Sequence, residues 1–275
     1  MLNTPKTIGE PGSLARLGAI LQSLPQVAVM LSGGMDSAFL LWACTHFLDK
    51  KHVKAVTFRS PTTPQHELAR AVQTAELLQV EHIILNTPEM EDEKFTGNDL
   101  LRCYYCKRIR VTYMLHNMDE LTATVLDGSH GDDLKEYRPG MKALDEFNII
   151  SPLLMAGLDR ASIVDLCNSY HLPFTGYPTE SCLATRIKTG QHLDADLLAR
   201  LDELEEAIRL LGVSLVRARY NNGEIRLEVR PEEIPVIIDK RADIVKIAQT
   251  MGLKPIALDL NGYGEKVGDS REILL

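Results

Sequence analysis

The sequence predicts an α/β protein with an open parallel sheet, followed by a smaller C-terminal α+β domain. Three observations support this: apolar runs alternate with helix-like segments in the first two thirds of the chain, a glycine-rich turn follows the first run, and a hairpin pattern appears only after residue 190. A chain of 275 residues can form one large domain or two modest ones. We therefore predict one domain over residues 1–190 and a second over 191–275.

The elements of the first domain follow from the spacing of its apolar residues. The run Val-Ala-Val-Met-Leu indicates a buried strand near residues 27–31. Further strands are predicted at 53–58, 82–85 and 123–126, and helices at 38–48, 65–78, 106–118 and 158–170. Parallel strands joined by right-handed crossovers all end at one edge of the sheet, called here the carboxyl edge, where ligands bind.

The turn after the first strand is the most informative segment, and it reads Ser32-Gly33-Gly34-Met35-Asp36-Ser37. Adjacent glycines let the backbone approach an anion closely, and the turn amides and the helix N-terminus favour phosphate. No Gly-Lys-Ser/Thr follows, so this is not the Walker pattern. A simple helix cap by Asp36 or Ser37 is the alternative. The position of the hexad directly after a buried strand favours ATP binding.

A Pro/Gly/Thr-rich loop at 173–189 leads to the second domain. Residues 195–211 are predicted to form a helix, and 234–251 are mostly helical. Strands at 215–220 and 225–230 flank Asn221-Asn222-Gly223, which is a hairpin signal. A last strand is predicted at 255–260.

Composition and charge limit the classes of partner. The chain is 45% hydrophobic and 25% charged, as is usual for a globular protein. No apolar run approaches the ~20 residues that span a bilayer, and the N-terminus lacks a secretory pattern, so we expect a cytoplasmic protein without a membrane partner. The net charge is −8, and both predicted domains are acidic. This argues against nucleic acid as a partner.

Three of the five cysteines are candidates for chemistry. Cys103 and Cys106 form a Cys-x-x-Cys pair predicted just before a helix, and basic residues follow that favour thiolates. Cys182 lies in the Pro/Gly loop. By contrast, Cys44 and Cys167 lie on apolar helix faces and are predicted to be core residues.

The cysteine pattern alone leaves several sites open. The pair can be a redox motif or half of a zinc site, for which His130 or His192 would have to supply a further ligand. Three cysteines without an obvious fourth ligand also suit a 4Fe-4S cluster with one open iron.

Several motifs together resemble the LarE-type sulfur transferases of the PP-loop ATP pyrophosphatase superfamily, whose fold is adenine nucleotide alpha hydrolase-like. The hexad, the Cys-Tyr-Tyr-Cys-Lys segment and the Ser-Cys-Leu-Ala-Thr-Arg segment around Cys182 carry the resemblance. Residues 127–128, 137–143, 216–220 and 225–228 are similar to other motifs of the family. The resemblance extends from about residue 13 to residue 265.

The resemblance implies a reaction. ATP, with Mg2+, adenylates a carboxylate of pyridinium-3,5-biscarboxylic acid mononucleotide, and pyrophosphate leaves. Sulfur then displaces AMP to give a thiocarboxylate, a step in nickel-pincer nucleotide cofactor biosynthesis. A homo-oligomer is implied, with the second domain binding substrate or joining subunits, and the sulfur donor is left undetermined.

The resemblance also gives roles to residues. The hexad residues that would bind the phosphates are Ser32, Gly33, Gly34 and Ser37, while Asp36 would act in catalysis with Mg2+. Ser60 and Gly128 would line the nucleotide pocket. The arginines expected to bind substrate oxyanions are Arg186, Arg217 and Arg219, and strand alternation places the last two on one face.

Two sulfur sources occur in such enzymes. A cysteine at the position of Cys182 can give up its own sulfur, or three cysteines can hold a 4Fe-4S cluster that carries sulfide. We favour the cluster, with Cys103, Cys106 and Cys182 as its catalytic ligands, because the first two have no role in a sacrificial enzyme. The competing functions are a tRNA thiolation enzyme, an amide-forming PP-loop ligase with structural zinc, and a nucleotide sensor without turnover.

Overall fold

The computed structural model describes residues 11–118, 123–135, 137–177 and 181–263. The chain divides into two compact units. The N-terminal unit comprises residues 1–95 and 99–180, and the C-terminal unit comprises residues 96–98 and 181–275.

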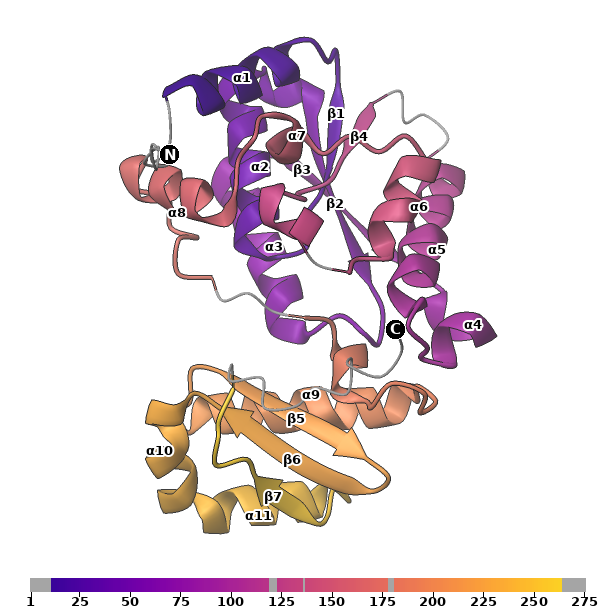
Figure 1. Cartoon of the computed structure of the whole chain (residues 1–275), viewed down its shortest axis with the longest axis vertical. Helices are drawn as coiled ribbons and strands as arrows, with labels where there is room; N and C mark the ends of the chain where they lie inside the picture. The colour runs from indigo at the N-terminus through magenta and orange to yellow at the C-terminus, as the bar shows by residue number, and fades with distance from the viewer. Residues whose placement is uncertain (1–10, 119–122, 136, 178–180, 264–275) are drawn as a thin grey trace, which may run out of the picture. The chain divides into compact units, whose positions relative to one another are not determined.

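The described part of the N-terminal unit contains a four-stranded parallel sheet in the order β3-β2-β1-β4 (Figure 1). Its strands are β1 (Val27–Met30), β2 (Val53–Arg59), β3 (Glu81–Asn86) and β4 (Thr124–Leu126). All four predicted strands form and pair in parallel, so the predicted fold class is confirmed. Strand β1, between β2 and β4, is apolar and buried at all four positions, because helices cover both faces of the sheet.

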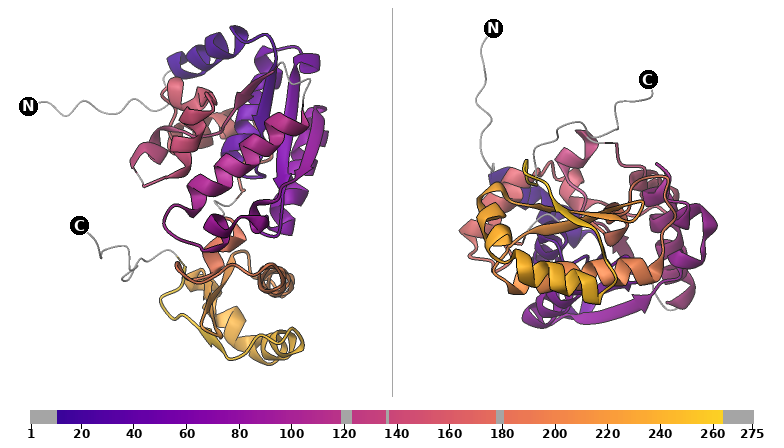
Figure 2. Two further views of the ribbon diagram at one scale, coloured as in Figure 1. Left: turned by 90° about the vertical axis from the view of Figure 1, so that its right-hand side faces the viewer. Right: turned by 90° about the horizontal axis from the view of Figure 1, so that it is seen from below.

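Helices cover both faces of this sheet (Figure 2). One face packs against α1 (Pro11–Gln22), α2 (Met35–Phe47), α3 (Gln65–Leu78) and α8 (Arg160–Ser169). The other packs against α5 (Arg102–Asn117) and α6 (Gly140–Glu146). The short helices α4 (Glu93–Thr96) and α7 (Pro152–Met155) lie in the connections.

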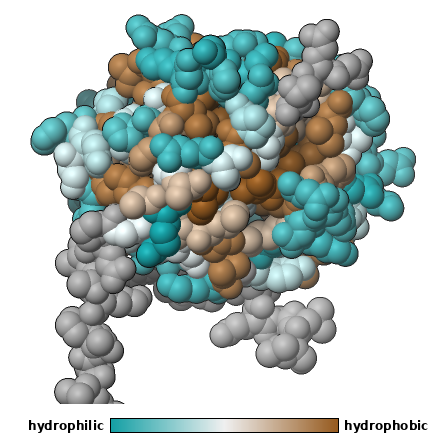
Figure 3. Space-filling view, turned by 90° about the horizontal axis from the view of Figure 1, so that it is seen from above, coloured by the Kyte–Doolittle hydropathy of each residue, from teal (hydrophilic) through white to brown (hydrophobic). Residues whose placement is uncertain are grey.

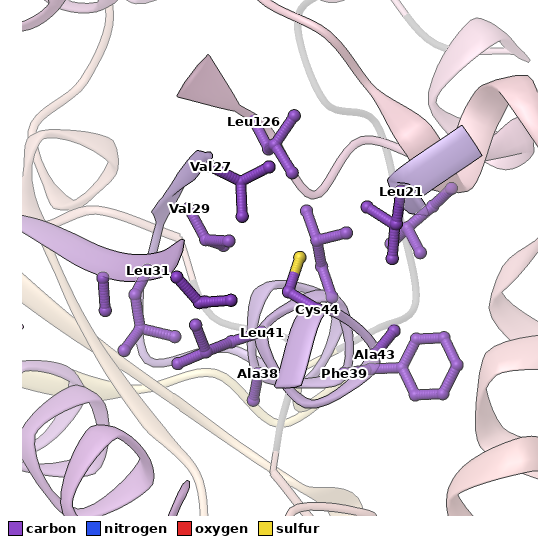
Figure 4. Packing of buried hydrophobic residues seen from close by; sticks show 14 of the residues in the cluster. Leu21, Val27, Val29, Leu31, Ala38, Phe39, Leu41, Ala43, Cys44 and Leu126 are labelled. Carbon is purple, nitrogen blue, oxygen red and sulfur yellow. The ribbon is translucent and has the colours of Figure 1, made fainter. Parts of the chain in front are cut away.

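Strand alternation divides the core of the N-terminal unit into two clusters. Val27 and Val29 face the α2 side, and Figure 4 shows Cys44 among the labelled apolar side chains of that cluster. Ala28 and Met30 face the α5 side.

Cys44 and Cys167 are fully buried, as predicted. Burial raises the pKa of the Cys44 thiol, and it raises the pKa of the Cys167 thiol to about 12. Both thiols therefore act as small apolar core groups.

On the face drawn in Figure 3, hydrophobic side chains gather in a band across the middle, with hydrophilic side chains around it. No helix within the described ranges has the length and apolar character that crossing a bilayer requires.

The described C-terminal unit has a three-stranded sheet in the order β5-β6-β7. Strands β5 (Val216–Asn221) and β6 (Glu224–Val229) form the predicted antiparallel hairpin, and β7 (Ile256–Leu258) pairs in parallel with β6. Asn222 and Gly223 in the turn both have positive φ, the conformation that such tight hairpin turns require. The helices are α9 (Ala195–Leu210), α10 (Ile234–Asp239) and α11 (Arg241–Thr250).

The division between the units falls about ten residues before the predicted boundary at 190, and it assigns the loop of Cys182 to the C-terminal unit. Two sets of contacts explain this assignment. The Asn98 side-chain amide donates hydrogen bonds to the carbonyl oxygens of Lys188 and Gln191, each at 3.0 Å. The Arg186 guanidinium pairs with Glu205 of α9.

Candidate functional site

The predicted phosphate loop forms a tight turn at the carboxyl edge, between β1 and α2. The hydroxyl groups of Ser32 and Ser37 lie 3.0 Å apart, and the amide of Ser32 donates to Ser37 Oγ at 3.2 Å. Helix α2 begins at Met35, earlier than predicted. Gly34 is its N-cap residue, and no side chain forms a capping hydrogen bond at this end of the helix. The first-turn amides of α2 are therefore not satisfied by a capping side chain, which suits an anion site.

Gly33 is required at its position for two reasons. Its φ is +87°, and a Cβ there would lie 2.1 Å from the carbonyl oxygen of Glu67 in α3. Replacing Gly33 with alanine is expected to lower the free energy of unfolding by about 2 kcal/mol or more, because both strain and a backbone clash result. Chemical denaturation measures this change.

Gly34→Ala is the matched control for that prediction. Gly34 has φ −87°, and a Cβ there would meet only Ser32 Oγ, at 3.4 Å. Gly34→Ala should therefore unfold near the wild-type midpoint. Equal destabilisation by both substitutions would show that the backbone shape of the loop is not the cause.

A series of contacts connects the phosphate loop to helix α5. A Cβ on Gly128 would lie 3.1 Å from the Ser37 amide nitrogen, so Gly128 allows β4 to approach the loop. Asp127, the preceding residue, accepts a hydrogen bond from Lys107 Nζ at 2.9 Å. Burial alone would raise the pKa of Asp127, but the Lys107 charge and bonds from Ser129 outweigh burial and hold the pKa below its usual value. Asp127 is therefore an anion that fixes α5 beside the loop.

Asp36 lies in the first turn of α2 and faces two residues that the sequence did not identify with it. The Arg160 guanidinium at the start of α8 forms an ion pair with Asp36 Oδ2. His130 Nε2 lies 3.7 Å from the same oxygen, while His130 Nδ1 accepts a bond from the Asp132 amide. The Asp36 carboxylate is thus held beside the phosphate loop.

Ser60 belongs to a buried polar network after β2 and β3. Its hydroxyl donates to Glu89 Oε1 at 2.7 Å, and Arg110 Nε of α5 donates to the same oxygen at 2.7 Å. Thr62 and Glu89 are fully buried. The network holds the segment after β2, where Ser60 was predicted to line the nucleotide pocket.

The Cys-x-x-Cys pair lies within α5 rather than before it, which corrects the prediction. Asp99 accepts bonds from the amides of Leu101 and Arg102, so the chain enters the helix before Cys103. Cys103 is exposed and Cys106 is half-buried. A spacing of three residues places both thiols on one side of the helix.

The three candidate cysteines are divided between the units, with Cys103 and Cys106 in the N-terminal unit and Cys182 in the C-terminal one. Within the described ranges, no three His, Cys, Asp or Glu side chains gather in a metal-binding arrangement. His192 is exposed, in the C-terminal unit.

Arg186 is fully buried and forms a bidentate ion pair with Glu205, with both N–O distances 2.8 Å. Its remaining nitrogen donates to the Ser181 carbonyl oxygen at 2.7 Å. Burial alone would raise the pKa of Glu205, but the bonds and charge of Arg186 hold that pKa below its ordinary value. Arg186 thus fixes the loop that carries Cys182.

Replacing Glu205 with glutamine is expected to lower the free energy of unfolding by about 3–5 kcal/mol, because a buried guanidinium loses its counter-charge. The contribution of Glu205 is fully present above its unfolded pKa of about 4.3 and is lost as the pH falls through the lower folded pKa. Urea titrations between neutral and acidic pH measure both effects. A Glu205→Gln protein as stable as wild type at neutral pH would contradict the assignment.

Arg217 and Arg219 lie on β5, as predicted. Arg217 is fully buried, and its guanidinium lies 5.3 Å from the centre of the Tyr263 ring. Arg219 is partly exposed and bonds to Glu228 Oε2 and to the Thr185 carbonyl oxygen, each at 2.9 Å. Arg219 and Arg186 therefore both contact the loop that follows Cys182.

Known proteins resemble this chain in part or over most of its length. A family model described as queuosine biosynthesis protein QueC matches residues 26–125. The uncharacterized protein slr1717 of Synechocystis is 30% identical over an alignment of 258 residues that covers 91% of this chain and 94% of that protein. The uncharacterized protein MJ0830 of Methanocaldococcus jannaschii is 25% identical, over 86% of this chain and 90% of its own.

A further relative has a name that describes chemistry. Pyridinium-3,5-bisthiocarboxylic acid mononucleotide synthase of Lactiplantibacillus plantarum is 28% identical over 252 residues, which are 90% of this chain and 91% of that protein. These matches extend across both units, whereas the QueC match, apart from residues 96–98, lies within the N-terminal unit.

Proposed function

Because the chain belongs to the LarE-type family of the PP-loop superfamily and is an ATP-dependent enzyme, we propose that it converts a substrate carboxylate into a thiocarboxylate. The proposed substrate is pyridinium-3,5-biscarboxylic acid mononucleotide, and the product is used in nickel-pincer nucleotide cofactor biosynthesis. The name of the Lactiplantibacillus plantarum relative, which covers most of both chains, supports this choice.

The observation that carries the proposal is the series of contacts from the phosphate loop to helix α5. Ser37 packs on Gly128, and the neighbouring Asp127 binds Lys107, one residue after Cys106. These contacts tie the start of α5 to the nucleotide loop within one unit. An enzyme that activates a carboxylate and then supplies sulfur needs both groups near the same edge of the sheet.

Adenylation is the first proposed step. A substrate carboxylate oxygen attacks the α-phosphorus of ATP, the bond to the bridging oxygen breaks, and pyrophosphate leaves with the electron pair. Amides of Gly33 and Gly34 and the hydroxyls of Ser32 and Ser37 would stabilise the charge on the phosphates. Asp36 would hold Mg2+, because hard carboxylate oxygens are its preferred protein ligands.

The second proposed step transfers sulfur. A sulfide attacks the acyl carbon, the carbon–oxygen bond to the phosphate breaks, and AMP leaves with its electron pair. Cys103, Cys106 and Cys182 would hold a 4Fe-4S cluster, which supplies the bound sulfide when it is present. The donor set fits: all three are cysteines, two share one side of α5, and none of these three lies in the apolar core.

The C-terminal unit is proposed to bind the substrate. Arg219, which is partly exposed, would bind a phosphate or carboxylate of the mononucleotide, whereas Arg217, predicted for the same role, is fully buried beside Tyr263. The role that we propose for Arg186 is to hold the loop of Cys182, because Glu205 occupies its guanidinium. Assembly into a homo-oligomer is part of the same proposal.

Pyrophosphate release tests the first step directly. With anaerobically purified protein, ATP and Mg2+, pyridinium-3,5-biscarboxylic acid mononucleotide should stimulate release, whereas nicotinamide mononucleotide, which lacks a carboxylate, should not. Iron and sulfide in equal amounts, after reconstitution, would support the cluster. Bound zinc in place of iron and sulfide, with ammonia as the consumed nucleophile, would instead identify an amide-forming ligase. Pyrophosphate release that is stimulated by tRNA alone would identify a tRNA enzyme.

A further inference from the structure

Arg160 connects the start of helix α8 to the phosphate loop. Its backbone amide donates to Asp132 Oδ2 at 3.0 Å, and α8 is capped by Asp159, whose Oδ1 accepts the Ser162 amide at 2.9 Å. These bonds fix the backbone of Arg160. Its side chain then reaches across to Asp36, 124 residues earlier in the chain.

The Asp36 carboxylate has two differently placed oxygens. Oδ2 contacts Arg160 and lies 3.7 Å from His130 Nε2, whereas Oδ1 is buried and accepts no hydrogen bond from the described residues. A cation bound at this carboxylate would place a second positive charge beside the Arg160 guanidinium and would therefore weaken the ion pair.

We propose that Arg160 is a pyrophosphate-binding residue, which pairs with Asp36 before nucleotide binds and contacts the leaving pyrophosphate once Mg2+ holds Asp36. This inference rests on the proposed adenylation. The Arg160 side chain is only 28% exposed, so a guanidinium displaced from Asp36 is stabilised by contact with another anion. The phosphates in the adjacent loop supply one, and the planar guanidinium matches two phosphate oxygens at once.

The proposed contact strengthens during the reaction. As the bond between the α-phosphorus and the bridging oxygen breaks, its electron pair goes to the pyrophosphate, whose negative charge increases. A guanidinium at this position stabilises the leaving group more than the bound ATP. The contact therefore acts mainly on kcat rather than on KM for ATP.

A purely structural role for Arg160, anchoring α8, is the competing explanation. Arg16 offers a matched control, because its Nε donates to the Ala156 carbonyl oxygen at 3.2 Å and so anchors the segment just before α8. Arg16→Gln removes a guanidinium from this segment, and Arg16 has no contact with Asp36 among the bonds of the described residues.

The kinetic test compares pyrophosphate release by Arg160→Gln, Arg160→Lys and Arg16→Gln. We expect Arg160→Gln to lower kcat about 100-fold with little change in KM for ATP. Arg160→Lys should recover part of the loss, because it keeps the charge but not the planar fork. Arg16→Gln should retain wild-type kcat. Equal losses in Arg160→Gln and Arg16→Gln would overturn the proposal.

Two binding measurements separate this proposal from the proposed reaction. Without nucleotide, Arg160→Gln should bind Mn2+ more tightly than wild type, because the competing guanidinium is gone. With Mg2+ present, it should bind inorganic pyrophosphate about tenfold more weakly or worse. Unchanged affinity for either probe would overturn the assignment. If both affinities shift but wild type shows no carboxylate-dependent pyrophosphate release, Arg160 binds pyrophosphate and the proposed reaction is wrong.

Discussion

Replacing Cys182 with serine is expected to abolish thiocarboxylate formation while one turnover of pyrophosphate release per active site persists. The hydroxyl replaces the sulfur that either mechanism needs, whereas the adenylation residues belong to the other unit. Single-turnover assays that follow pyrophosphate and thiocarboxylate in the same sample measure the two steps. Loss of both products together would show that Cys182 supports the fold or ATP binding rather than sulfur transfer.

Cys103→Ser and Cys106→Ser distinguish the two sources of sulfur. If the three cysteines hold a cluster, each of these changes should abolish sulfur transfer as completely as Cys182→Ser and lower the bound iron. Cys44→Ala is the matched control, because that thiol is enclosed in the apolar core. Full activity in both variants, with wild-type Cys182 converted to dehydroalanine after turnover, would instead identify Cys182 as a sacrificial donor.

Replacing Asp36 with asparagine is expected to slow pyrophosphate release by about 100- to 1,000-fold, the loss typical when one charge-stabilising group is removed from an active site. Asparagine keeps the shape but binds Mg2+ more weakly, and it leaves Arg160 without its counter-charge. The measurement is steady-state pyrophosphate release as a function of Mg2+ concentration.

The control for that prediction is Asp49→Asn. Asp49 lies before β2, at the opposite end of the strand from the phosphate loop, and contacts the exposed Lys51. We expect wild-type release from Asp49→Asn. Wild-type release from Asp36→Asn, at limiting Mg2+, would remove Asp36 from the mechanism.

The fold could be predicted where periodicity was strong. The apolar runs of β1 and β2 and the alternation of β5 and β6 gave the strands, and these pair as predicted. Helix α1 was missed, and the helix predicted over 234–251 is two helices, α10 and α11. Short helices such as α6 and α7 carry little periodic signal, because one or two turns present too few apolar positions.

The site was predictable only where its residues are adjacent in sequence. The hexad forms the expected loop. Arg160 and His130, which lie next to Asp36 in the structure, are 124 and 94 positions away from it in the sequence, and no local pattern identifies them as its neighbours. The Ser60–Glu89–Arg110 network was missed for the same reason. Arg186 was predicted to bind a substrate oxyanion, yet Glu205, one helix later, forms a buried ion pair with it.

The central claim is that one chain activates a carboxylate with ATP and exchanges its oxygen for sulfur. Its most direct test is mass spectrometry of the products formed by anaerobically reconstituted protein with ATP, Mg2+, sulfide and pyridinium-3,5-biscarboxylic acid mononucleotide. We expect a thiocarboxylate, with one AMP and one pyrophosphate formed per sulfur introduced. An unchanged dicarboxylate, or an amide formed when ammonia replaces sulfide, with ATP consumed in either case, would contradict it.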